Sequence, residues 1–142
     1  MLAAALTEPL SLTIGNLGLY RLPAGYYAYC GSAHGPGGLQ ARIRRHLNLN
    51  APVFWHIDYI KRQVSLEAVY WLESNSRMEC CLAQVLAAFP AAIIPVPAFG
   101  SSDCRSGCLA HLVYFREKKI MQTVLREFSA NGQTLDCINL AV

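Results

Sequence analysis

The sequence lacks the features that mark several special classes of protein. None of its apolar runs approaches the roughly 18 residues that span a bilayer, and it contains no internal repeat, linker or low-complexity block. Charged residues make up 15% and apolar residues 54% of the 142 residues. Because disordered chains are rich in charge and poor in apolar residues, this composition excludes that class. The length fits one domain, residues 1–142, with its own hydrophobic core.

The cysteines come with neither a regular spacing nor an export signal. The apolar stretch Leu2–Leu6 has no basic flank, so we expect no signal peptide. Thiols that are not exported stay reduced, and we therefore expect a cytoplasmic protein. The six are Cys30, Cys80, Cys81, Cys104, Cys108 and Cys137.

Three residues of the types that bind metals lie close together in the last third of the chain. Cys104, Cys108 and His111 form part of a zinc-ligand set, which Cys80 or Cys81 could complete. The spacing is not that of a common zinc module, and His111 falls inside an expected strand. The sequence alone therefore argues against structural zinc at Cys104, Cys108 and His111.

Positive charge is concentrated in one stretch although the formal net charge is only +3. Between Leu39 and Arg62 there is a single acid, Asp58. The basic and imidazole residues of this stretch are Arg42, Arg44, Arg45, His46, His56, Lys61 and Arg62. A local basic patch attracts phosphates, and a solvated helix face is the competing interpretation.

The pattern of apolar residues predicts an α+β fold. Strands are expected at residues 10–14, 17–22 and 26–30, where tight turns would join them into an antiparallel meander. A helix is expected at 39–48, with Leu39, Ile43 and Leu47 in one apolar stripe and Arg42 at its edge. Further expected elements are a short helix or extended segment at 53–61, strands at 66–72 and 109–115, and helices at 76–89 and 117–128. Together they indicate a central, mainly antiparallel sheet flanked by helices.

The segment from Gly25 to His46 contains the most informative motif. An aromatic strand ends in glycine, a glycine-rich loop follows, and a helix then presents an arginine. Tyr29-Cys30-Gly31 and the later Leu39-x-x-Arg42-x-x-x-His46 resemble the second half of the GIY-YIG nuclease signature. No Gly-Lys-Ser/Thr follows the glycines, which excludes a P-loop.

The resemblance is closer to one bacterial and archaeal branch of this superfamily and covers about residues 10–115. Four further segments resemble that branch in the same order. They are Pro-Ala-Gly-Tyr-Tyr at 23–27, Trp-His-Ile-Asp-Tyr at 55–59, Glu-Cys at 79–80, and Gly-Ser-Ser-Asp-Cys at 100–104. The helix and tail at 117–142 lie outside it.

The resemblance implies a metal-dependent endonuclease that hydrolyses nucleic-acid phosphodiesters, with DNA the expected partner and no membrane. It implies Tyr29, Arg42 and His46 as catalytic residues and Glu79 as ligand of one magnesium or manganese ion. An arginine offers two aligned donors to phosphate oxygens, and a tyrosine with an ordinary pKa of about 10 needs tuning before it can help deprotonate water. The residues expected to contact nucleic acid are Arg44, Arg45, His56, Lys61 and Arg62.

Several alternatives stay open at this point. The superfamily opens with Gly-x-Tyr on its first strand, and either Tyr20 in Gly18-Leu19-Tyr20 takes that place or the chain lacks this strand. Glu79 would close a capping box with Ser76 as well as bind a metal. A catalytically silent nucleic-acid-binding module and a structural or protein-interaction domain are the two alternative functions. The oligomeric state does not follow from the sequence.

Overall fold

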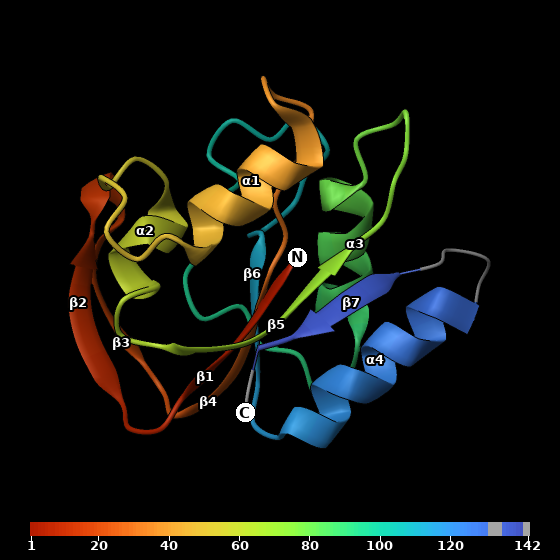
Figure 1. Cartoon of the computed structure of the whole chain (residues 1–142). Coiled ribbons are helices and arrows are strands. Elements are labelled where there is room, and N and C mark those ends of the chain that lie inside the picture. The colour runs from red at the N-terminus through yellow and green to blue at the C-terminus, as the bar shows by residue number, and fades with distance from the viewer. Residues whose placement is uncertain (131–134, 141–142) are drawn as a thin grey trace.

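A five-stranded antiparallel sheet forms the centre of the molecule (Figure 1). The computed structural model describes residues 1–130 and 135–140. The strands occur in the order β6-β4-β1-β5-β7. They are β1 (Leu2–Leu6), β4 (Gly25–Tyr29), β5 (Ser65–Trp71), β6 (Leu112–Phe115) and β7 (Asp136–Asn139). With the helices below, this arrangement confirms the expected α+β fold class.

The expected meander of three strands is wrong. The strands β2 (Leu10–Ile14) and β3 (Gly18–Leu22) pair only with each other, around a short 3-10 helix at Gly15–Leu17, and form a separate two-stranded sheet. The strand β4 instead pairs with β1 and β6. The physical reason is the apolar segment Leu2–Leu6, which the sequence analysis had not assigned to a strand: four of its five residues are buried, and it fills the middle of the sheet.

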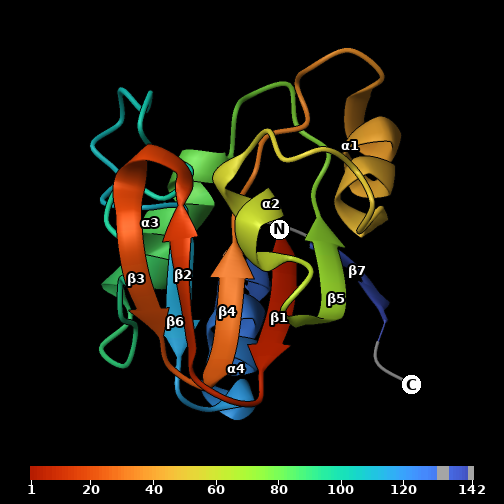
Figure 2. The ribbon, with the colours of Figure 1, turned by 90° about the vertical axis from the view of Figure 1, so that its left-hand side faces the viewer.

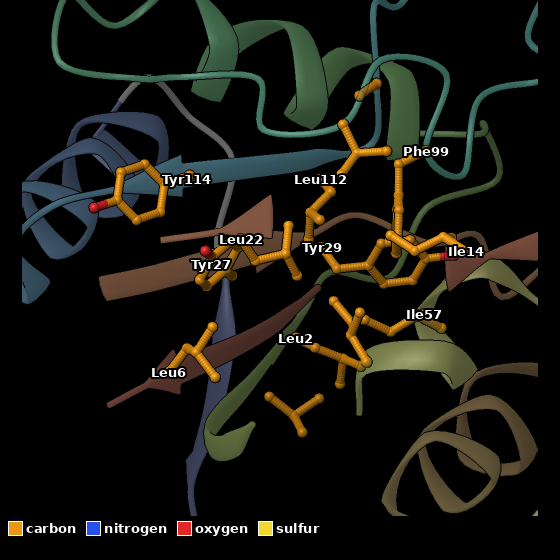
Figure 3. Close-up of a cluster of buried hydrophobic side chains, with 14 residues drawn as sticks. Leu2, Leu6, Ile14, Leu22, Tyr27, Tyr29, Ile57, Phe99, Leu112 and Tyr114 are labelled. Atoms are coloured by element: carbon orange, nitrogen blue, oxygen red, sulfur yellow. The ribbon is translucent and has the colours of Figure 1, made fainter. Parts of the chain in front are cut away.

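The two faces of the sheet are covered by different elements (Figure 2). The β2–β3 hairpin and α2 (His56–Ile60) cover one face, and α3 (Glu79–Ala88) and α4 (Lys118–Ala130) cover the other. Alternation along β4 places Tyr27 and Tyr29 in the first core, shown in Figure 3, and Ala28 and Cys30 in the second. Tyr27 and Tyr29 thus lie on the same face of the sheet.

Helix α1 (Gly38–Leu47) lies across one end of the sheet, at the top of Figure 1. It begins after Gly37, which has a φ of 80°. A Cβ at this position would lie only 2.6 Å from the Ala41 Cβ, so any residue other than glycine would be strained. The expected stripe is only partly right: Ile43 is half-buried, but Leu47 is 39% exposed and His46 is buried in its place.

Helix α3 begins three residues later than expected. Its first residue is Glu79, the N-cap is Met78, and no side chain caps the helix. The capping box of Ser76 and Glu79 is therefore wrong, and the Ser76 carbonyl instead lies 3.1 Å from His34 Nε2. On this helix Leu82 and Leu86 are buried, and Val85 is 40% exposed. Within the residues described, no helix has both the length and the apolar character needed to cross a membrane.

Candidate functional site

Three of the expected catalytic residues gather where β4 ends. Tyr29 meets the ring of His46 edge-on at 5.9 Å between centroids. The His46 ring lies 5.6 Å from the ring of Trp55, and the Arg42 guanidinium lies 4.2 Å above that same Trp55 ring. We call Tyr29, Arg42, His46 and Trp55 the Arg42 cluster. Gly31 lies against this cluster, since a Cβ there would be 3.3 Å from the Tyr29 ring, a tight contact, and 3.8 Å from His46 Nε2.

Burial sets the protonation states in the Arg42 cluster. It raises the pKa of Tyr29 to about 12, and the positive charge of Arg42 opposes that shift only in part. Burial, together with a smaller contribution from the positive charge of Arg42, lowers the pKa of His46 to about 4. At neutral pH Tyr29 is therefore a protonated donor and His46 an uncharged imidazole. Arg42 carries the positive charge of the cluster.

A loop from the opposite side of the first core supports Tyr29. The ring of Phe99 packs edge-on against Tyr29 at 5.9 Å, and Gly100 is so close that a Cβ would lie 3.0 Å from the Tyr29 ring. The Gly100 amide donates to His56 Nδ1 at 2.8 Å. His56, expected to contact nucleic acid, thus uses one ring nitrogen to hold this loop, and burial lowers its pKa.

Glu79 faces a cavity beside the Arg42 cluster. The cavity has a volume of about 620 Å³, and its wall includes Gly31, Ser32, Leu39 and Glu79. The Glu79 Oε2 atom is buried and has no hydrogen-bond partner in the part of the chain that the structure describes. Arg42 reaches the same glycine-rich loop, since its Nη2 atom lies 3.6 Å from a Cβ built on Gly35. The glycine-rich loop thus lies against Arg42 and forms part of the wall of the cavity that Glu79 also lines.

Most of the basic stretch has internal partners. Asp58 is fully buried in its side chain and forms ion pairs of 2.8 Å with Arg45 and 2.7 Å with Lys61. It also accepts the backbone amides of Phe54 and Trp55, both at 2.9 Å. Burial opposes ionisation, but the Lys61 ammonium and these amides outweigh it and lower the pKa of Asp58. We call Arg45, Asp58 and Lys61 the Asp58 network.

The Asp58 network changes the expected nucleic-acid contacts. The Lys61 side chain is 0% exposed, so its ammonium cannot touch a phosphate without leaving the ion pair. Arg62 donates to the carbonyls of Leu49 and Ala51. Arg44 is exposed and, with Arg42, remains available to a ligand.

Tyr20 lies apart from the sheet that carries Tyr29. It is on β3, in the two-stranded sheet, where it pairs with Leu12, and it packs half-buried against the first core. The segment that pairs with β4 along its whole length is β1, with Leu2 opposite Tyr29. The strand that pairs with all of β4 is therefore Leu2–Leu6, which contains no tyrosine.

A second group of reactive side chains lies next to Glu79. Cys80, Cys104, Cys108 and His111 place their ligand atoms within 4.8 Å of one another, and they could hold a metal ion. We call them the Cys–His cluster. His111 directly precedes β6, so the expectation that it lies inside a strand is wrong. Backbone amides of Cys108 and Ser106 lower the pKa of Cys104 to about 6, whereas burial and the neighbouring thiols raise the pKa of Cys108 to about 12.

One member of the Arg42 cluster and one member of the Cys–His cluster were not identified from the sequence. Trp55, whose ring lies next to two guanidinium groups, was named only as part of a motif, although an aromatic residue among arginines is itself a signal. Cys80 was one of two possible completions of the Cys–His cluster. Cys81 is exposed and belongs to no such cluster among the described residues.

The fold and these groups define an α+β domain with a polar site at one end of its central sheet. A family model for a domain of unknown function, DUF123, matches residues 1–133, and the chain belongs to this family. No curated protein and no solved structure matches the chain.

Proposed function

We propose that this domain binds nucleic acid, with DNA as the expected substrate, and hydrolyses its phosphodiester bonds with the help of a divalent metal ion. One observation carries the proposal. The Arg42 guanidinium lies beside the glycine-rich loop, and Glu79, whose buried Oε2 atom has no hydrogen-bond partner among the described residues, lines a cavity along that loop. The resemblance to GIY-YIG nucleases supports the same four positions: Tyr29, Arg42, His46 and Glu79.

Each residue has a role that follows from its surroundings. The Arg42 guanidinium, held over Trp55, offers paired donors to phosphate oxygens. Tyr29, whose pKa is raised to about 12, donates a hydrogen bond and does not remove a proton from water. Glu79 suits magnesium or manganese, because hard cations take carboxylate oxygens and its Oε2 atom has no partner in the described structure. Such an ion, when bound, offsets negative charge on the phosphate and on the leaving oxygen.

A second candidate is a module that binds nucleic acid without cleaving it. Proton transfer is fastest when the pKa of the base lies near the working pH. The pKa values of Tyr29 and His46, about 12 and about 4, both lie far from neutrality. The exposed Arg44 and the 80% exposed Phe54 would serve binding in either case.

Metal-dependent nicking of supercoiled DNA tests the proposal. We expect nicking with magnesium or manganese. We expect Glu79→Gln to abolish both this nicking and the binding of magnesium or manganese. Glu73→Gln is the matched control, because Glu73 is an exposed acid in the wall of the same cavity. If Glu79→Gln nicks like the parent, Glu79 is not a ligand. If the parent binds DNA in a salt-dependent manner but never nicks it, the second candidate is correct.

A further inference from the structure

The Cys–His cluster joins two parts of the chain that are separate in sequence. Cys80 lies in the first turn of α3, directly after Glu79. Cys104, Cys108 and His111 belong to the segment that leads into β6. The described backbone brings them together without a disulfide, since all the cysteines are free.

Two separations within the Cys–His cluster are close to those of ligands around one small ion, and all its ligand atoms lie within 4.8 Å of one another. Zinc binds sulfur at about 2.3 Å and nitrogen at about 2.0–2.1 Å, so neighbouring ligand atoms in a tetrahedron lie about 3.5–3.8 Å apart. The Cys80 Sγ atom lies 3.5 Å from the Cys104 Sγ atom and 3.6 Å from the His111 Nε2 atom. A disulfide would bring two sulfurs to about 2.05 Å.

The turn between two of the cysteines is shaped to present both sulfurs. Gly107 has a φ of +74°, a left-handed conformation that glycine adopts without strain. The Ser106 amide donates to the Cys104 Sγ atom at 3.3 Å, and the Ser106 carbonyl accepts from Gln84 of α3 at 2.8 Å. Amide donors to sulfur favour a thiolate, the form that binds metal. The turn is thus fastened to α3 beside the Cys–His cluster.

We propose that Cys80, Cys104, Cys108 and His111 bind one zinc ion at a closed structural site. Three thiolates and one imidazole are ligands for zinc and not for magnesium or calcium, which take oxygen. Four protein ligands complete a tetrahedron and leave no position for water or substrate, which distinguishes a structural from a catalytic zinc. The ion is therefore separate from the one expected at Glu79, and the zinc assignment does not depend on the proposed function.

The zinc ion would fasten the support of the Arg42 cluster to helix α3. The His111 amide donates to the Phe99 carbonyl at 2.8 Å, and the His111 carbonyl accepts from the Cys30 amide at 2.9 Å. Phe99 packs on Tyr29, as described above. A zinc ion bound to both His111 and Cys80 would thus link the loop that contains Phe99 with the first turn of α3, which contains Glu79.

Metal analysis of the full chain, purified under reducing conditions, tests this proposal. We expect about one zinc ion per chain in the parent, as for a four-ligand structural site. Cys81→Ser is the matched control, since Cys81 is the exposed neighbour of Cys80, and it should retain the zinc. Cys80→Ser and Cys108→Ser each remove a zinc ligand. Their affinity for zinc should fall by more than the roughly 10- to 100-fold that is typical when a residue hydrogen-bonded to a ligand is changed.

Cobalt substitution provides a readout that does not require the ligand variants to fold. Cobalt bound to the parent and to Cys81→Ser should show the intense visible bands of a tetrahedral site together with sulfur-to-cobalt charge transfer. A zinc-free parent that also gives no such spectrum would overturn the proposal. A Cys80–Cys104 disulfide in the reduced preparation, bound iron with inorganic sulfide, or equal metal loss in Cys81→Ser and Cys80→Ser would overturn it as well.

Discussion

Arg42 and Arg45 lie three residues apart on α1, and both guanidinium groups lie over the ring of Trp55, at 4.2 and 5.0 Å from its centroid. Arg45 is bound to Asp58 and to the Pro52 carbonyl. The Arg42 side chain makes no hydrogen bond or ion pair with another residue of the described chain. Two arginines in one motif thus have different roles: one completes the Asp58 network inside the fold, and the other keeps its donors free for a ligand. The number of basic residues in a stretch of sequence therefore does not show how many of them are available to bind a ligand.

The largest effect is expected from the centre of the Asp58 network. Asp58→Ala would leave Lys61, whose side chain is 0% exposed, as a buried charge without its partner. Such a change typically lowers the free energy of unfolding by about 3–5 kcal/mol. Urea unfolding at pH 7 measures it. Asp103→Ala is the control, because it removes the same charge from an exposed position and should change stability by less than about 0.5 kcal/mol. Equal losses in both variants would contradict the network.

The contrast between the two arginines gives the next effect. Arg42→Ala should slow phosphodiester nicking by about 100- to 1000-fold, as expected for loss of one preorganised donor to developing charge, and leave stability nearly unchanged. Arg45→Ala should do the opposite and lower the free energy of unfolding by about 1.5–3 kcal/mol, the range for hydrogen bonds to charged groups. Nicking rates and urea unfolding on both variants measure the two quantities. If Arg45→Ala lost activity without losing stability, the comparison would be wrong.

A smaller effect is expected in the pH dependence of stability. The folded state lowers the pKa of Asp58, so its contribution is present above the unfolded value of about 3.9 and lost as the pH falls below it. The free energy of unfolding should therefore decrease from pH 5 towards acid, and less steeply in Asp58→Asn than in the parent. Thermal unfolding across this range measures the difference. Parallel curves would show that Asp58 is not the group responsible.

The smallest effect concerns the exposed arginine of the same helix. Arg44 is free to contact a phosphate, and each lost phosphate contact reduces the salt slope of binding by about one unit. Titration of labelled DNA at several salt concentrations should show that reduction for Arg44→Ala. Arg126→Ala, which removes an exposed arginine from α4, should leave the slope unchanged. A parent slope near zero would favour a structural or protein-interaction domain.

Local patterns predicted much of the fold and failed at two strands. The helices at α1, α3 and α4 and the strands β2 to β6 follow from residue periodicity and turn residues. The strand β1 escaped because its alanines have low strand propensity, although small residues suit a strand that lies between two packed layers. The strand β7 has four exposed residues, so it carries no apolar pattern.

The candidate site could be predicted only where its residues are close in sequence. Tyr29, Arg42 and His46 lie within one motif, and the structure brings them together. The partner of Arg45 is Asp58 and one partner of Cys104 is Cys80, and both come from other elements. The choice between a free arginine and a bound one, or between a free thiol and a metal ligand, is made by tertiary packing that a single sequence does not display.

The central position of β1 has a consequence for folding during synthesis. Leu2 pairs with both Tyr29 and Val69, so the two halves of the sheet can join only through a strand that leaves the ribosome before either of its partners. Such distant pairings slow folding, because the loops must close before the contacts form. Until β5 emerges, one edge of Leu2–Leu6 stays open to other chains, and a co-translational chaperone that covers this edge would prevent such contacts.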